Sequence, residues 1–453
     1  MKTSSIPASP MPVGLGKNIR TIHRGARRIA SPLLLLIILM QLTTIALYYF
    51  GPIDYKNIKY EVAGWILYYL FMLLLGSFFA RNFYLKNKSD LPGEFIARRR
   101  KFVLHSFLFS MLFILPTFYG RVGGFHLAGS LGEQYAMAAA YSAANQSIVE
   151  YVRMFFSVYL FGFFPTYLYF YDKLSPKLKK IGLVVSVLNL LLAVFTGVNK
   201  YLFDYALIGI AIFMLKYAIK RKKNYAKIFF SACILGVVFS VLLYFFALGQ
   251  ASREGSPSIK GIDPKMDSVA AYNLDDGLFL MGYSALTSYL TQGYRIFDMS
   301  LDEKFVWTYG IGNSTFLSRQ ADKVLGTNIG DLTYPARLEY RGTDRYINWS
   351  TFYLWWVSDL GYLGVGILTF LAGFLFRISE NTVFKTSDHE ALIIYAYLTI
   401  GFFYLSANNQ LFQSGETAVG FFYLMIKIML TKKISILPSG RRAEQIHAKP
   451  CIA

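Results

Sequence analysis

Six arginines lie in one long polar stretch of the chain, between about residues 249 and 350. They are Arg253, Arg295, Arg319, Arg337, Arg341 and Arg345. A guanidinium group is planar and permanently charged, and it can hold a phosphate through two parallel hydrogen bonds. Tyrosines and phenylalanines lie between the arginines. The stretch is therefore predicted to present a surface that binds phosphates and sugars.

The last three of these arginines recur every four residues, which on a helix would place them on one face. A competing interpretation is a solvated network in which Arg341 pairs with Asp344 or Glu339. Both interpretations stay open for each arginine taken singly.

A histidine and several charged residues at the ends of apolar runs are further candidates. His126 is the one histidine of five that the expected topology places outside, where it could accept a proton from a sugar hydroxyl; a plain loop histidine is the competing interpretation. Charged residues in apolar runs are costly and therefore mark function. Those near the outer ends of the runs are Lys200, Asp204, Asp359 and Glu416, for which pairing or helix capping are the alternatives.

The elements that must position these residues are membrane helices. The chain is 55% hydrophobic and 17% aromatic over 453 residues, which exceeds what a soluble protein carries. Ten apolar runs are expected to form transmembrane helices. They are Ser31 to Phe50, Val62 to Ala80, Phe102 to Tyr119, Tyr151 to Tyr171, Ile181 to Thr196, Tyr201 to Tyr217, Ile228 to Leu248, Phe352 to Phe376, Ala391 to Ala407 and Glu416 to Leu430.

Lysine and arginine are concentrated at both termini and in the loops after the second, fourth and sixth runs. The positive-inside rule therefore places both termini in the cytoplasm and the long polar stretch outside. The net charge of +20 then reflects topology and anionic lipid rather than nucleic acid binding. The two cysteines, Cys233 and Cys451, lie outside the polar stretch, so no disulfide can stabilise it.

The predicted fold is an all-α polytopic integral membrane protein with about ten transmembrane helices. Its expected parts are a cytoplasmic N-terminal segment (1–30), helices one to seven (31–248), a large, partly helical outer loop carrying the site (249–350), helices eight to ten (351–430) and a cytoplasmic tail (431–453). The N-terminal run lacks a cleavage site and is read as a retained helix rather than a signal peptide. No P-loop pattern is present, and neither a metal nor a cofactor is expected.

Four short stretches carry a resemblance to a known family. They are Phe195-Thr-Gly-Val-Asn-Lys200, Tyr289-Leu-Thr-Gln-Gly-Tyr-Arg295, Gly310-Ile-Gly-Asn-Ser-Thr-Phe316 and Ser358-Asp-Leu-Gly-Tyr-Leu-Gly364. Together with the layout of the whole chain, they resemble the O-antigen polymerase (Wzy-type oligosaccharide repeat-unit polymerase) family. Relatives often carry arginine after the Thr-Gly turn, where this chain has Lys200.

The resemblance implies a glycosyltransferase of the bacterial inner membrane with a periplasmic active site, acting in O-antigen or related surface polysaccharide synthesis. It would transfer a growing glycan from undecaprenyl pyrophosphate to the terminal sugar of a new lipid-linked repeat unit. The arginines and Lys200 would hold the pyrophosphate, and His126, Glu254 or Glu416 would accept the proton. The implied partners are undecaprenyl-pyrophosphate-linked glycans, membrane lipid, a chain-length regulator (polysaccharide co-polymerase) and a flippase.

Two alternatives remain. An O-antigen ligase would share the architecture and differ in its acceptor. A lipid-linked oligosaccharide flippase or transporter would show inverted repeats and charges at mid-membrane, and the sequence has no internal repeat.

Overall fold

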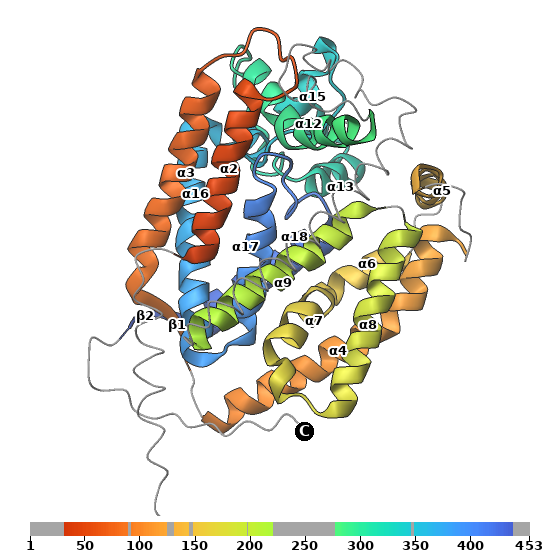
Figure 1. Ribbon diagram of the computed structural model, residues 1–453, viewed down its shortest axis with the longest axis vertical. Coiled ribbons are helices and arrows are strands. Elements are labelled where there is room, and N and C mark those ends of the chain that lie inside the picture. Colours follow the sequence, from red (N-terminus) through yellow and green to blue (C-terminus); the bar gives the residue numbers. More distant parts are fainter. Residues whose placement is uncertain are drawn as a thin grey trace, which may run out of the picture.

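The computed structural model describes residues 31–88, 92–124, 131–144, 148–196, 198–220, 277–345 and 348–437 (Figure 1). Nearly all its regular elements are helices, and two short strands form the one sheet seen in these ranges. Six helices are long and apolar enough to cross a membrane. They are α2 (Pro32–Phe50), α3 (Glu61–Phe79), α4 (Pro92–Val122), α8 (Pro176–Phe195), α9 (Asn199–Lys220) and α16 (Phe352–Thr386). The chain thus has the character of a multi-pass, all-α membrane protein.

A seventh candidate span is broken. Helices α6 (Ile148–Phe155) and α7 (Ser157–Phe170) follow each other at an angle of 63°, with the break at Phe156. The fourth expected run is therefore two helices rather than one straight span. The bend turns α6 away from the axis of α7, and α6 carries two of the charged residues described below.

Two of the ten expected runs form helices that are shorter than a full span, and a third, Ile228 to Leu248, lies outside the described residues. The ninth and tenth correspond to α17 (His389–Phe403) and α18 (Gly415–Thr431), which have 15 and 17 residues. At 1.5 Å per residue, α17 covers only about 22 Å, less than the roughly 30 Å hydrocarbon thickness.

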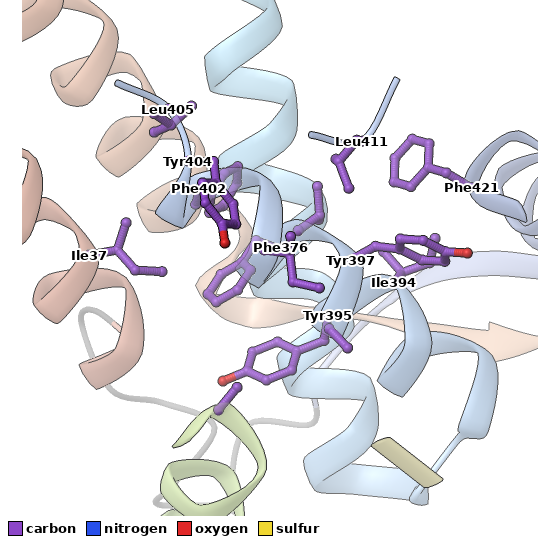
Figure 2. Close-up of a cluster of buried hydrophobic side chains, with 14 of the residues drawn as sticks. Ile37, Phe376, Ile394, Tyr395, Tyr397, Phe402, Tyr404, Leu405, Leu411 and Phe421 are labelled. Atoms are coloured by element: carbon purple, nitrogen blue, oxygen red, sulfur yellow. The ribbon is translucent and has the colours of Figure 1, made fainter. Parts of the chain in front are cut away.

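Helix α17 lies at the centre of the fold. Every residue from His389 to Phe402 is buried, which fits a sequence that is apolar all round. Figure 2 shows Phe376 of α16 beside Tyr395 and Phe402 of α17, and the Phe376 and Tyr395 rings stack with centroids 4.8 Å apart. The chain after α17 is irregular but largely buried. Irregular backbone at membrane depth is tolerated when it is enclosed by protein.

Helices α3 and α16 pack closely because a glycine on each helix faces the backbone of the other helix. A Cβ added to Gly76 would lie 1.9 Å from the carbonyl oxygen of Phe370, and one added to Gly373 would lie 2.0 Å from that of Leu73. Small residues permit such contact between membrane helices. The strands β1 (Phe83–Asn87) and β2 (Lys432–Ile436) then pair antiparallel at one end of the helices.

A layer formed by one longer helix and several short ones covers the opposite end (Figure 1). It comprises α12 (Gly277–Ser300), α13 (Thr315–Leu325), α14 (Ile329–Leu332), α15 (Tyr334–Arg337) and the 3₁₀ turn η3 (Glu339–Arg341). We call this the outer layer. It is the described part of the long polar stretch, and it is partly helical as expected. Helix α5 (Leu131–Ala144) lies between α4 and α6 in the chain.

The three regularly spaced arginines do not share a helix face, so that expectation is wrong. Helix α15 ends at Arg337, and Arg341 closes the separate turn η3. Gly342 then adopts φ +85°, a left-handed conformation that ends the helical path before Arg345. Local backbone geometry overrides the four-residue spacing.

Candidate functional site

Four charged side chains from three helices form a cluster at the end of the helices nearest the outer layer. We call it the guanidinium–carboxylate cluster: Arg121 at the end of α4, Glu150 and Arg153 on α6, and Glu416 in the first turn of α18. The two arginines each hold one carboxylate through paired hydrogen bonds. Such bidentate pairs are the strongest and most directional that arginine makes.

The distances define the cluster. Arg121 donates from Nε and Nη2 to the two oxygens of Glu150 at 2.7 and 3.0 Å. Arg153 donates from Nη2 to both oxygens of Glu416 at 2.8 Å. Arg121 Nη2 also lies 3.8 Å from Glu416, which joins the two pairs into one network. The four side chains are between 13% and 31% exposed, so they remain accessible while being shielded from bulk water.

Neighbouring elements hold the cluster in place. Thr117, one turn before Arg121, accepts from Arg153 Nη1 at 2.5 Å, and Tyr201 of α9 accepts from Arg121 Nη1 at 2.7 Å. Gly415 packs closely, since an added Cβ would lie 2.5 Å from Met154 Cε and 2.6 Å from Phe316 Cε2. A larger residue at this position, directly before Glu416, would displace these two side chains.

A further ion pair adjoins the cluster at the start of α9. Lys200 contacts Asp204 at 2.5 Å, as their i, i+4 spacing predicts. Its ammonium group also lies 5.9 Å from the centroid of the Tyr404 ring. Tyr201, which follows Lys200 directly, accepts a hydrogen bond from Arg121 of the cluster. Lys200 therefore lies near Glu416, so the structure brings these two predicted site residues into the same region.

Three other predicted site residues, His126, Arg253 and Glu254, lie outside the described residues. Three loop arginines are held by carboxylates of the outer layer instead of meeting the cluster. Arg295 contacts Asp298 at 3.6 Å, Arg341 contacts Glu303 at 2.9 Å and Arg345 contacts Glu339 at 2.7 Å. Arg341 is thus paired with carboxylates, as the competing interpretation expects, but its partners are Asp302 and Glu303 rather than Asp344 or Glu339. The partner of Arg295, Asp298, is buried rather than solvated.

The other two loop arginines donate only to backbone oxygens among the described residues. Arg337 donates to the carbonyls of Leu332 and Lys304 at 3.1 and 2.8 Å. Arg319 is exposed, and its Nε donates to the carbonyl of Thr315 within the same helix. Helix α13 begins beside Gly415, because Phe316 contacts that glycine. Arg319 is therefore the loop arginine on the helix whose start adjoins the cluster.

Asp359 of α16 holds the segment of the outer layer that connects α12 to α13. Its two oxygens accept from Thr308 Oγ1, from the backbone N–H groups of Gly310, Gly312 and Asn313, and from Asn313 Nδ2, at 2.5 to 3.3 Å. The carboxylate is 4% exposed. Backbone N–H groups that converge on one acceptor form an anion nest, and here the anion is part of the protein.

The same segment presents aromatic rings to solvent. Trp307 and Tyr309 flank the buried Thr308, are 56% and 61% exposed, and have ring centroids 5.0 Å apart. At its other end the segment is tied to the start of α18, because Ser314 Oγ donates to the carbonyl of Phe412 at 2.5 Å. An exposed aromatic pair on a fixed backbone is a surface on which a sugar ring can pack.

Of the four stretches that carry the family resemblance, one is part of α16 and two pack against it. Gly293 approaches the backbone at Thr351 and Ser406, where an added Cβ would lie 3.0 and 2.3 Å away. The stretch from Gly310 to Phe316 binds Asp359, which itself belongs to another of the stretches.

The ion pairs of the outer layer predict a dependence of stability on pH. The hydrogen bond from Lys59 lowers the pKa of Asp302, and the bond from Arg345 lowers that of Glu339. A carboxyl with a lowered folded-state pKa stabilises the fold above the ordinary pKa near 4, and this stabilisation is lost as the pH falls through the lower value. Burial instead raises the pKa of Asp298. Protonation of this carboxyl at low pH therefore removes the free-energy cost of burying its charge.

Protease resistance of residues 300–345 is expected to fall modestly below about pH 4, since exposed pairs contribute less than about 1 kcal/mol each. Limited proteolysis over a pH series measures it. The variant D302N with E339Q should be less resistant at neutral pH and lose most of this dependence. Equal resistance of the wild-type protein at pH 3 and pH 7 would contradict the assignment.

Arg121, Glu150 and Arg153 are not among the site residues predicted from the sequence. Arg153 falls inside the expected fourth run, between Val152 and Met154, and an arginine within an apolar run is itself a signal of function. Arg121 and Glu150 bracket the loop between the third and fourth runs. Their 29-residue separation hides the pairing that the structure reveals.

No group of three metal-ligating side chains is present in the part of the chain that the structure describes. In the cluster, each of the two guanidinium groups is paired with one of the two carboxylates. Comparison of the chain with protein-family models, curated proteins and solved structures finds no significant match.

Proposed function

We propose that this protein polymerises lipid-linked oligosaccharide repeat units, as the resemblance to O-antigen polymerases implies. The substrate would be a glycan on undecaprenyl pyrophosphate, and the product a glycan longer by one repeat unit. The observation that carries the proposal is the guanidinium–carboxylate cluster, in which two arginines lie within one network at the membrane-facing edge of the outer layer.

In this proposal Arg121 and Arg153 bind the pyrophosphate of the donor lipid. Each guanidinium already holds a carboxylate in the bidentate geometry that a phosphate would take over. Fixed positive charge stabilises the diphosphate as negative charge develops on it, and this stabilisation is stronger where water is excluded. Lys200 supplies a further cation, and Arg319 can reach the phosphate or the first sugars from α13.

In the proposed transfer step, one bond forms while another breaks. The oxygen of the acceptor hydroxyl forms a bond to the anomeric carbon of the donor glycan, while the bond from that carbon to the pyrophosphate oxygen breaks. The electron pair leaves with undecaprenyl pyrophosphate, and the hydroxyl proton passes to a carboxylate. Glu416 is the proposed acceptor because replacement of Glu416 by phosphate on Arg153 frees its oxygens. His126 and Glu254 remain alternatives for this role.

The proposal includes a topology. The protein would lie in the bacterial inner membrane with ten spans, cytoplasmic termini and a periplasmic outer layer. This topology would bring the cluster to the face where lipid-linked units are exposed. The helices would hold both polyprenyl tails so that the reacting centres meet, which is catalysis by positioning. A chain-length regulator and a flippase would act as partners.

Purified protein in proteoliposomes, given one lipid-linked repeat unit, should convert it into a ladder of longer glycans. The reaction is measured by gel separation of labelled product. Unchanged substrate, in conditions where a control polymerase works, would contradict the proposal. Product formed only when lipid A core is added would instead indicate the ligase, and movement of substrate across the bilayer without extension would indicate the flippase.

A further inference from the structure

At the end of the helices opposite the guanidinium–carboxylate cluster, one arginine is buried without an anion. Arg99, early in α4, is only 5% exposed. Its Nε is buried and has no hydrogen-bond partner among the residues that the structure describes, and no ion pair to Arg99 is formed there. A buried guanidinium nitrogen without a hydrogen-bond partner costs free energy, so this side chain needs an explanation.

The immediate neighbours of Arg99 offset only part of this free-energy cost. Its guanidinium carbon lies 5.3 Å from the ring centroid of Phe170 and 5.8 Å from that of Phe95. Cation–π contacts at such distances contribute about 0.5–2 kcal/mol, less than the cost of an unpaired buried charge.

The nearest carboxylate does not neutralise Arg99, because it already has partners. Asp388 attracts Arg99 electrostatically, yet one of its oxygens accepts from the backbone N–H of Ala391 at 2.9 Å and the other forms an ion pair with Lys432. Glu390 likewise pairs with Lys427 and Lys432. The acids of this region are therefore committed to the start of α17 and the end of α18.

Other groups around Arg99 are suited to an incoming anion. Lys173, at the end of the 3₁₀ turn η2 (Tyr171–Lys173), is exposed and lies close enough for its charge to be repelled by that of Arg99. Phe170, whose ring contacts Arg99, lies three residues before Lys173. Two cations are therefore present in this region, and a phosphate can accept hydrogen bonds from both.

The surrounding surface favours a lipid over a soluble anion. Arg98, Arg100 and Lys101 are exposed next to Arg99, and Lys177 and Lys180 are exposed just after η2. From Arg100 onward, an exposed apolar stripe follows α4 at helical spacing through Leu104 and Leu108 to Leu115, all between 37% and 59% exposed. A phosphate beside basic residues and acyl chains along an apolar helix face together describe a phospholipid.

We propose that Arg99 and Lys173 bind the phosphate of an anionic phospholipid at this end of the helices. The site is independent of the proposed polymerase activity. Because Arg99 is the buried member, it supplies most of the binding, and the exposed arginines contribute only general attraction.

The test is the melting temperature of purified protein in a zwitterionic detergent, with and without added phosphatidylglycerol. Wild-type protein and the matched control R98M should both melt several degrees higher with phosphatidylglycerol, and R99M should not. Without anionic lipid, R99M should melt at the same temperature as wild type or above it, because the substitution removes an unpaired buried charge. An equal shift for R99M and wild type with phosphatidylglycerol would overturn the proposal.

Two further arms keep the test decisive. Phosphatidylcholine and inorganic phosphate replace phosphatidylglycerol in parallel samples, and an equal shift with either would show that no anionic lipid is selected. If R99M fails to fold, K173M serves in its place and should show a measurably smaller shift than wild type. An undiminished shift in K173M would then also overturn the proposal.

Discussion

Replacing Arg153 with methionine is expected to abolish the glycan ladder, with a loss in rate of at least about 100-fold. The reason is that Arg153 provides the paired donors that would hold the leaving diphosphate, and methionine fills the same space without charge. The rate of ladder formation in proteoliposomes measures the effect. K304M, which removes an exposed cation of the outer layer, should retain activity.

A second variant separates chemistry from stability. R153M alone leaves Glu416 with one distant cation, Arg121 at 3.8 Å, so a lower melting temperature is expected as well, equivalent to up to about 3 kcal/mol. Adding E416Q removes the stranded carboxylate and should restore the melting temperature while the ladder remains absent. Full ladder formation by R153M at normal melting temperature would remove Arg153 from the proposed site.

Replacing Asp359 of α16 with alanine is expected to lower stability more than any single change within the outer layer. The backbone N–H groups of Gly310, Gly312 and Asn313 would lose the carboxylate that accepts from them. Thr308 Oγ1 and Asn313 Nδ2 would keep the carbonyls of Ser358 and Gly310 as acceptors. Each buried donor left unsatisfied costs about 1–3 kcal/mol, although the segment can relax. We expect a large drop in melting temperature and rapid proteolysis between residues 300 and 345.

Two variants calibrate this result. D359N keeps the shape but places an amide where Asn313 donates, so it should fall between wild type and D359A. D331N alters an exposed carboxylate of the same layer and should melt close to wild type. A wild-type melting temperature for D359A would mean that packing alone holds the segment from Thr308 to Asn313.

The membrane helices were predictable from the sequence because their signal is local. A run of about 20 apolar residues has few alternatives to a helix in lipid, since every backbone polar group must be satisfied within the segment. The helices α2, α3 and α9 accordingly begin and end within a few residues of the expected runs. Pairing of Lys200 with Asp204 was predictable for the same reason, because both lie on one helical turn.

The guanidinium–carboxylate cluster was not predictable in this way. Glu150 meets Arg121 across 29 residues, and Arg153 meets Glu416 across 263 residues. No local pattern encodes contacts of that length. The spacing of Arg337, Arg341 and Arg345 was misleading because a helix face exists only where the helix is continuous, and Gly342 interrupts it.

The sequence alone determined that this is a multi-span helical membrane protein with arginines and aromatic residues in a long polar stretch. It did so because hydrophobic length and charge are properties of neighbouring residues. The tertiary structure decided which charges meet: it paired three loop arginines within the outer layer and brought Arg121 and Arg153 into one network with Glu150 and Glu416. The physical reason is that an ion pair depends on distance in space, which helix packing and the bend between α6 and α7 set.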